Sequence, residues 1–128
     1  MVRALLEGYN CSLFAYGQTG AGKTHTMMGV LGQESLRGLQ PRCLEYLFYL
    51  LKEKQMETLI KVTYVEIYNE KIYDLLTEDD TALSLREDLK QGVYIESVTE
   101  EIVASASEAM NVLKVGQNRR RVSETQMN

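Results

Sequence analysis

The octapeptide GQTGAGKT, Gly17–Thr24, is the feature that most constrains how this chain can fold. It fits the spacing G-x-x-x-x-G-K-[ST] and follows an apolar run, Cys11–Tyr16, that predicts a buried strand. From Lys23 to about Met28 the residues favour a helix. A strand that ends in a glycine-rich turn and restarts as a helix directs several backbone N–H groups at one point. Because the helix dipole adds positive potential there, the pattern predicts a phosphate-binding loop.

Each residue type in this loop has a physical role. The three glycines lack a Cβ, so the backbone can curl closely around an anion. Lys23 is expected to reach the β- and γ-phosphates, and Thr24 to offer its hydroxyl to Mg²⁺. The alternative is a glycine turn that merely connects two elements. The predicted nucleotide contacts are Gly17, Gln18, Thr19, Gly20, Ala21, Gly22, Lys23 and Thr24.

The residues after the loop predict further helices and strands. Gly29–Gly38 has three glycines and no sustained period, which indicates a loop. A helix is expected from Pro41, because apolar residues then recur at helical spacing, and to end in Lys52–Lys54. Its apolar stripe is Leu44, Leu47, Phe48 and Leu51. Another helix is predicted after Ser105, because Glu108 follows at the capping-box spacing, with Ala109, Val112 and Leu113 as its buried stripe.

Between these helices the sequence favours strands. Leu59–Tyr68 is rich in β-branched and aromatic residues and predicts one interior strand. Asn69–Leu76 is expected to continue it, with one helical turn as the expected form. Ala82–Asp88 and Gly92–Val98 predict a hairpin-like pair of shorter strands at one side of the sheet. No internal repeat or linker is visible, which indicates one α/β domain or part of one.

Composition excludes several classes of function. A formal net charge of -4 argues against general nucleic-acid binding, and the basic run Arg119–Arg121 is interpreted as a solvated helix face. The longest apolar run, Tyr46–Leu51, is too short to span a bilayer. Cys11 and Cys43 lie far apart, which argues against a metal cluster or a disulfide scaffold. We therefore expect a cytoplasmic protein without membrane insertion.

The groups that would hydrolyse a nucleotide are harder to find. A phosphate-binding loop also needs an acid that orders Mg²⁺ and a group that positions the attacking water. Asp74 is the nearest candidate acid, but a surface carboxylate at a strand end is the simpler interpretation. Glu66, Glu70 and Asp74 share one continuous element, so we interpret them as structural rather than as paired general acids. The guanine-binding pattern N-K-x-D is absent from the sequence.

Read together, the segments resemble the kinesin motor domain over almost the whole chain and in the right order. The phosphate-binding loop alone would be generic, but its combination with the other segments is highly specific. The matching segments are LLEGYNCSLFAYGQTGAGKTHTMMG (5–29), GLQPRCLEYLF (38–48), VTYVEIYNEKIYDLL (62–76), LREDLKQGVYIESVTEEIVAS (85–105) and VGQNRRRVSETQMN (115–128).

The resemblance implies a P-loop NTPase-type three-layer α/β fold with ATP and Mg²⁺ as cofactors. It implies an ATPase that moves along microtubules in the cytoplasm. His25 matches a position used against the adenine, with an ordinary exposed helix histidine as the alternative. Arg86, Lys90 and the arginines near the last helix match a region that reaches tubulin. Residues 1–128 would then be part of a single motor domain, with an incomplete central sheet. The N-terminal strands, switch I, switch II and the neck linker would lie outside the chain, and no catalytic residue within it.

One alternative function remains open at this stage: an inactive or non-motor partial kinesin fragment that at most binds nucleotide weakly. Another P-loop enzyme, such as a small-molecule kinase or a GTPase, is disfavoured by the specific kinesin segments and by the lack of a guanine-binding motif. The resemblance also implies that two strands absent here separate the strand before the loop from Val62–Tyr68. Each orphaned buried backbone group costs roughly 1–3 kcal/mol, against a native stability of about 5–15 kcal/mol. We therefore expect that the 128 residues alone do not form a stable, competent motor, which urea unfolding and ATPase assays would test.

Overall fold

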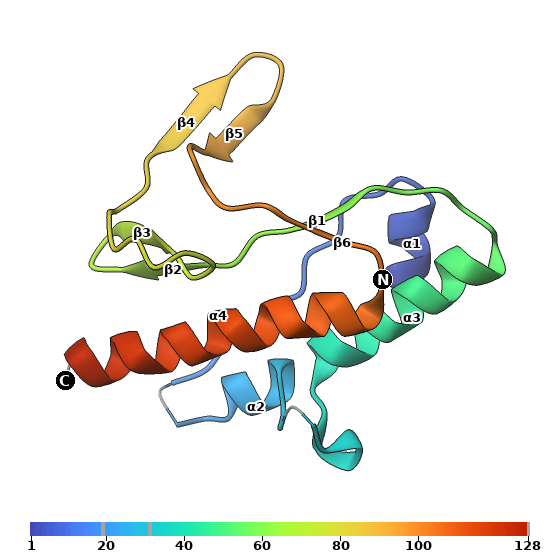
Figure 1. Ribbon diagram of the computed structural model, residues 1–128, viewed down its shortest axis with the longest axis horizontal. Helices are drawn as coiled ribbons and strands as arrows, with labels where there is room; N and C mark the ends of the chain where they lie inside the picture. Colours follow the sequence, from blue (N-terminus) through green and yellow to red (C-terminus); the bar gives the residue numbers. More distant parts are fainter. Residues whose placement is uncertain (19, 31, 128) are drawn as a thin grey trace. The chain divides into compact units, whose positions relative to one another are not determined.

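The computed structural model describes residues 1–18, 20–30 and 32–127, with side chains as far as Arg120. The chain divides into two compact units, Met1–Thr58 and Leu59–Asn128, and each is described by itself. The first is helical, and the second combines short antiparallel strands with one long helix (Figure 1). This mixture agrees with the predicted α/β class. No helix in the described part of the chain is long and apolar enough to cross a membrane.

The first unit is built around one amphipathic helix. Its elements are α1 (Val2–Leu6), α2 (Lys23–Met27), the 3₁₀ turn η1 (Glu34–Leu36) and α3 (Leu39–Glu53). Both α1 and α2 contact α3. The predicted helix is confirmed, with a start two residues before Pro41, which is fully buried in the first turn. Leu50 and Leu51 are the most buried leucines of α3. The loop predicted over Gly29–Gly38 is also confirmed, apart from η1 within it.

The predicted strand Cys11–Tyr16 does not form. Its residues lie in neither a helix nor a strand, and none of the described strands pairs with them. Phe14 and Tyr16 are 87% and 102% exposed, so the prediction of a buried strand is wrong for this chain. A strand is stable only when a neighbour supplies hydrogen bonds and apolar cover. The apolar run is present, but the described residues contain no neighbour for it.

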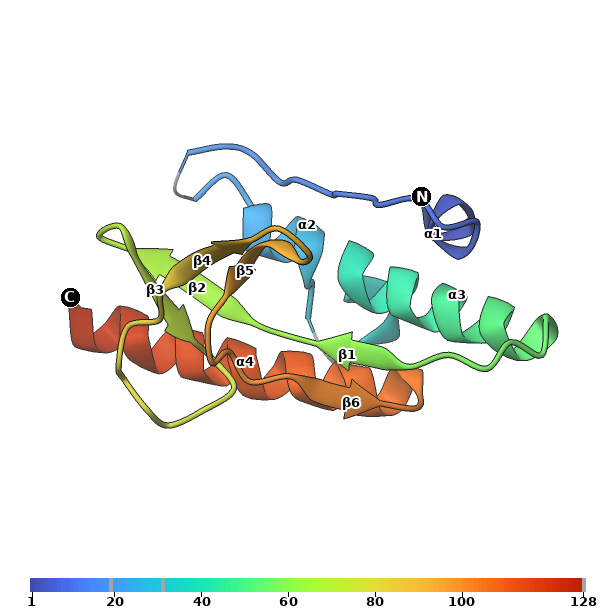
Figure 2. The ribbon, with the colours of Figure 1, turned by 90° about the horizontal axis from the view of Figure 1, so that it is seen from above.

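The described residues of the second unit form three two-stranded antiparallel sheets and one long helix (Figures 1 and 2). The sheets are β1 with β6, β2 with β3, and β4 with β5. In the first of them Ile60 lies opposite Val103, and β6 packs on the helix α4. The strand bounds are β1 Ile60–Val62, β2 Val65–Tyr68, β3 Lys71–Asp74, β4 Leu85–Asp88, β5 Gly92–Ile95 and β6 Glu101–Val103. The helix α4 spans Ala106–Met127.

The region predicted as one long strand is divided instead. Two residues, Thr63 and Tyr64, separate β1 from β2, and the chain then reverses at Asn69 and Glu70. Both turn residues have positive φ, +48° and +63°, which is the geometry of a two-residue type I′ hairpin turn. The predicted continuation of the strand with a helical turn is therefore wrong. Ile67 is 73% exposed, so β2 is not an interior strand either.

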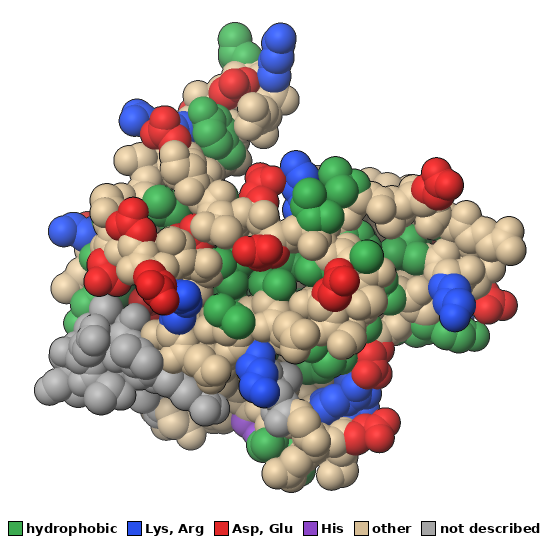
Figure 3. Space-filling view, viewed as in Figure 1, with side chains coloured by type: hydrophobic (Ala, Val, Ile, Leu, Met, Phe, Trp, Pro, Cys, Tyr) green, Lys and Arg blue, Asp and Glu red, His purple; other side chains and the backbone are tan. Residues whose placement is uncertain are grey.

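The hairpin predicted over residues 82–98 is confirmed. In β4 and β5, Leu85 pairs with Ile95 and Asp88 with Gly92, whose φ of +72° favours glycine at the turn. The two strands form a separate sheet rather than one side of a larger one. The hairpin stands clear of the rest of its unit (Figure 3), and Leu89 in its turn is fully exposed.

The helix α4 begins at the predicted capping box. The Ser105 hydroxyl accepts a hydrogen bond from the Glu108 N–H at 3.1 Å, and the Glu108 carboxylate accepts one from the Ala104 N–H at 2.6 Å. Further along, the Tyr64 ring packs where a Cβ on Gly116 would overlap it, and the Tyr64 hydroxyl donates to Gln117. The helix therefore carries a notch that only glycine provides. The core of this unit includes Leu75, Val103, Ala109 and Leu113.

Candidate nucleotide-binding site

The glycine-rich loop contains two residues in the left-handed region of backbone conformation. Gly20 and Gly22 adopt φ of +85° and +93°, and Gly22 is the N-cap of α2. A Cβ at either position would meet no atom within 4 Å. Backbone conformation, rather than lack of space, is therefore what requires glycine there, since other residues rarely adopt positive φ. At Gly17 the reason is space, because its Cβ would lie 3.1 Å from that of Ala21.

Lys23 places a positive charge on this loop. Its side chain is half-buried, and its ammonium group donates a hydrogen bond to the Gly17 carbonyl oxygen at 2.5 Å. The lysine thus spans the loop from the first turn of α2 to the loop's first residue. The ammonium group has three donors and uses one of them among the described residues, so its charge is held where the sequence predicts a phosphate.

The other predicted contacts are more open. Thr24 and His25 are exposed in the first turn of α2, and neither side chain has a hydrogen-bond partner among the described residues. The Ala21 N–H donates a hydrogen bond to Gln18 O at 3.0 Å. Thr19 lies outside the described residues.

The donor set suits Mg²⁺ held together with phosphate. No cluster of three His, Cys, Asp or Glu residues in the described ranges could hold a metal by itself. Mg²⁺ commonly keeps several waters and takes one or two protein ligands together with phosphate oxygens. The exposed Thr24 hydroxyl at the N-terminus of α2 fits that coordination, so the residues present fit a metal that arrives with a nucleotide.

A backbone clasp holds the C-terminal end of α2. We use this name for residues 28–30 and 36–38, which pair antiparallel: Gly38 N donates to Met28 O at 3.0 Å, and Val30 N to Leu36 O at 2.8 Å. A Cβ on Gly29 or Gly38 would overlap the backbone of the opposite segment. The sequence interpretation treated this region only as a loop. The glycines at its two ends were the signal of a close crossing.

Comparison with known proteins identifies the family to which this chain belongs. The sequence model of the kinesin motor domain family matches residues 1–128. This chain belongs to the kinesin motor domain family. It is 46% identical to the kinesin-like protein KIF15-A of Xenopus laevis, 45% to KIF15 of Homo sapiens and 44% to KIN-12E of Oryza sativa subsp. japonica. Each alignment covers the whole chain but only 10%, 10% and 7% of the relative.

A solved structure of a fast kinesin gives the same fold. It superposes with a TM-score of 0.92 at 41% identity, over 99% of this chain and 37% of the kinesin chain. The P-loop NTPase-type fold predicted from the sequence is therefore confirmed. The chain spans about a tenth of the length of the two KIF15 relatives.

In this kinesin chain Asp74 has a structural position. It is 6% exposed at the end of β3, and its two carboxylate oxygens accept the N–H groups of Leu76 at 2.9 Å and Thr99 at 2.7 Å. The interpretation as a surface carboxylate is therefore wrong, although the strand-end position is right. Glu66 faces Tyr73 across the β2–β3 pair, and Glu70 lies in the turn.

The basic residues expected to contact tubulin differ in whether they already form an ion pair within this chain. Arg86 pairs with Glu96 across the β4–β5 hairpin at 2.8 Å, and this hydrogen bond raises the pKa of the guanidinium. Lys90 is exposed in the hairpin turn. On α4, Arg119 lies 3.9 Å from Glu78. The side chain of Arg121 lies outside the described residues.

Proposed function

We propose that this chain is the ATP-binding portion of a microtubule motor that couples ATP hydrolysis to movement. One observation carries the proposal: in a chain of the kinesin family, Gly20 and Gly22 are in the left-handed region, and the Lys23 ammonium group is hydrogen-bonded to the Gly17 carbonyl oxygen. A loop of this geometry directs backbone N–H groups and a positive charge at one point, which suits a polyphosphate.

The roles of the residues follow from their chemistry. The backbone of residues 17–22 would hold the phosphates, and Lys23 would exchange its bond to Gly17 O for the β- and γ-phosphate oxygens. Thr24 would hold Mg²⁺, which, when bound, neutralises phosphate charge. His25, exposed on the same turn, would lie against the adenine.

Hydrolysis would proceed by in-line attack of water on the γ-phosphate. We assign no residue of this chain to positioning that water. Asp74, the nearest candidate acid, already accepts hydrogen bonds from the N–H groups of Leu76 and Thr99. The part of this chain is to bind the nucleotide. Arg86 and Lys90 would contact tubulin, and the protein would act in the cytoplasm on microtubules.

The test is a titration of the intact protein with a fluorescent ATP analogue, with and without Mg²⁺. Lys23→Ala removes charge-assisted hydrogen bonds and should weaken binding by about 10- to 100-fold. Thr24→Ala should mainly reduce the gain in affinity that Mg²⁺ gives. Lys61→Ala is the matched control, since Lys61 is an exposed lysine paired with Glu100 in the other unit. If the wild type does not bind, or Lys23→Ala loses nothing, the proposal fails.

A second measurement separates a motor from a fragment that only binds nucleotide weakly. The segment Cys11–Tyr16, unpaired among the described strands, favours the weaker function for residues 1–128 by themselves. Microtubule-stimulated ATP turnover by the intact protein supports the motor. Binding without such turnover supports the second function.

A further inference from the structure

The helix that carries Lys23 and Thr24 is too short to hold its own orientation. α2 has five residues, and its N-cap, Gly22, supplies no side-chain hydrogen bond. Isolated helices shorter than about 12 residues are marginal in water, because nucleation costs more than so few hydrogen bonds return. The direction in which Lys23 and Thr24 point therefore depends on what holds the other end of α2.

That other end is held by the clasp of residues 28–30 and 36–38. The Gly29 N–H donates back to Thr24 O at 3.3 Å, and Met28, 3% exposed, is buried at the point where α2 meets the clasp. The two inter-segment hydrogen bonds and the close glycine crossing leave this junction little freedom. A displacement of the clasp is therefore passed to α2.

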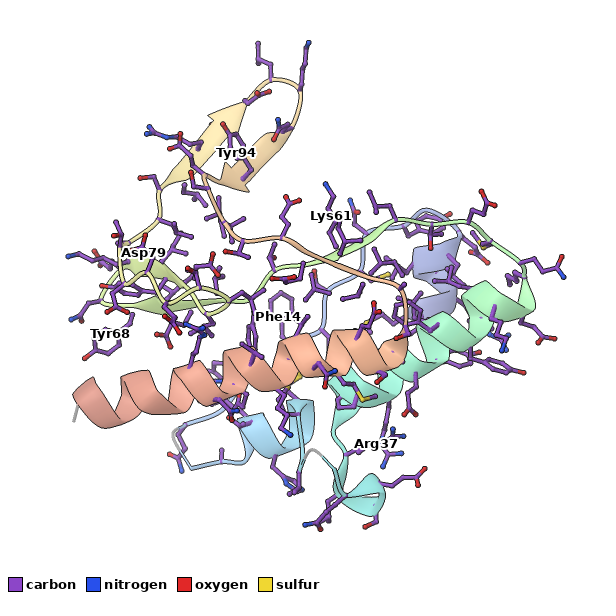
Figure 4. The ribbon with its side chains drawn as sticks, in the orientation of Figure 1. Phe14, Arg37, Lys61, Tyr68, Asp79 and Tyr94 are labelled. Carbon is purple, nitrogen blue, oxygen red and sulfur yellow. The ribbon has the colours of Figure 1, made fainter. Side chains whose placement is uncertain are left out.

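Arg37 fastens the clasp to the long helix α3. Its guanidinium forms an ion pair with Glu45, and its carbonyl oxygen accepts a hydrogen bond from the Arg42 guanidinium at 3.1 Å. Figure 4 shows Arg37 where the chain passes from η1 into α3. The Arg37 side chain is only 16% exposed, and its Nε is buried without a partner. A guanidinium that is largely withdrawn from water depends on its remaining partner, Glu45.

We propose that Arg37 is a positioning residue for nucleotide binding: its ion pair with Glu45 fixes the clasp on α3 and so orients Lys23 and Thr24. The proposal rests on the proposed function, since it concerns the same site. Arg37 itself does not touch the nucleotide. Its effect is on the geometry of α2, so it should change the affinity for ATP and leave the chemical step unaffected once ATP is bound.

The experiment is a charge-swap cycle in the intact protein. Arg37→Glu and Glu45→Arg each place like charges together, and the double variant restores an ion pair in reversed order. We expect each single variant to raise KM for ATP and the Kd of a fluorescent ATP analogue about five-fold, with kcat within about two-fold. The double variant should return both values to within about two-fold of wild type.

Controls separate positioning from general destabilisation. Lys61→Glu breaks a pair whose side chains are both 49% exposed, Lys61–Glu100, and should leave KM unchanged. The unfolding midpoint of each variant is measured without nucleotide. The proposal is overturned if the single variants lower this midpoint while Kd and KM stay at wild-type values. It is also overturned if the double variant does not bring Kd and KM back towards the wild-type values. Should Arg37→Glu fail to fold, Glu45→Gln removes the negative charge of the pair without introducing a like charge, and its KM and Kd for ATP and the analogue decide in the same way.

The outcomes also separate this inference from the proposed function. If Lys23→Ala abolishes binding while the swap cycle changes nothing, only the role of Arg37 is wrong. If the wild-type protein does not bind ATP at all, the proposed function and the role of Arg37 fail together.

Discussion

The two compact units differ in whether their strand-forming segments find hydrogen-bond partners. In the second unit β2 pairs with β3 across two residues, and β4 with β5 across three, and the β1–β6 pair also closes within the unit. In the first unit the apolar run Cys11–Tyr16 finds no partner among the described residues, although its composition favours a strand. Strands with a partner among the described residues therefore form, even where, as for Ile60 and Val103, the partners lie far apart in the sequence, whereas the apolar run without a described partner does not form a strand.

Amide hydrogen exchange in the 128-residue chain would sharpen this comparison most. The amides of Cys11–Tyr16 donate to no described backbone group, whereas those of residues 110–120 lie inside α4. We expect the first set to exchange about 100-fold faster than the second, because exchange from an intact helix requires local or global opening. Equal rates in the two segments would remove the difference between the units.

Asp74 tests how far the second unit depends on its own internal bonds. Asp74→Ala leaves two backbone N–H groups, those of Leu76 and Thr99, without their acceptors. We expect a loss of about 2 kcal/mol in the free energy of unfolding, measured by urea denaturation, with unchanged affinity for MgATP. Asp80→Ala, at an exposed aspartate nearby, is the control and should have little effect. A loss of MgATP affinity would instead return Asp74 to a role in the nucleotide site.

A substitution in the capping box tests the most local of the sequence patterns in the second unit. Ser105→Ala removes the hydroxyl that accepts the Glu108 N–H, and should lower the free energy of unfolding by about 1 kcal/mol. The matched control is Ser107→Ala, since Ser107 is exposed two residues further on and has no bonded partner among the described side chains. Similar urea midpoints for the two variants would show that the cap contributes nothing.

The smallest effect concerns the first unit and its dependence on pH. The hydrogen bond from Arg37 is the main cause that lowers the pKa of Glu45, although burial opposes it. A lowered pKa stabilises the folded state above the unfolded value of about 4.3, and this contribution is lost as the pH falls through the lower folded value. The difference in urea midpoint between wild type and Glu45→Gln should thus be present at pH 7 and shrink below about pH 4. A difference that grows in acid would contradict this sign.

The features that could be predicted from the sequence are those fixed by neighbouring residues. The turn at Gly22 followed by a helix from Lys23, the capping box at Ser105 and the hairpin closed at Gly92 each depend on a few adjacent side chains and on backbone preference. The apolar stripe of α3 is equally local, since its period lies in the sequence itself.

The features that could not be predicted depend on residues that lie outside the local sequence pattern. Asn69 and Glu70 reverse the chain in left-handed geometry, for which Glu has no special preference. The Thr99 N–H that Asp74 accepts comes from 25 residues away, and Glu45, the ion-pair partner of Arg37, lies within α3. At the candidate site the loop itself was recognisable, because its chemistry lies in eight consecutive residues. The clasp that supports it depends on a crossing of two backbone segments.

The capped helix α4 also has a mechanical consequence. Its 22 residues make a rod of about 33 Å, fixed near one end by Ser105 and Glu108 and notched at Gly116 by the Tyr64 ring. A tilt of one degree about the capped end would move the last turn by about 0.6 Å, by the length of such a rod. A small rotation at the cap would thus become a larger displacement at the far end of α4, and the Tyr64 ring in the notch at Gly116 would restrain it.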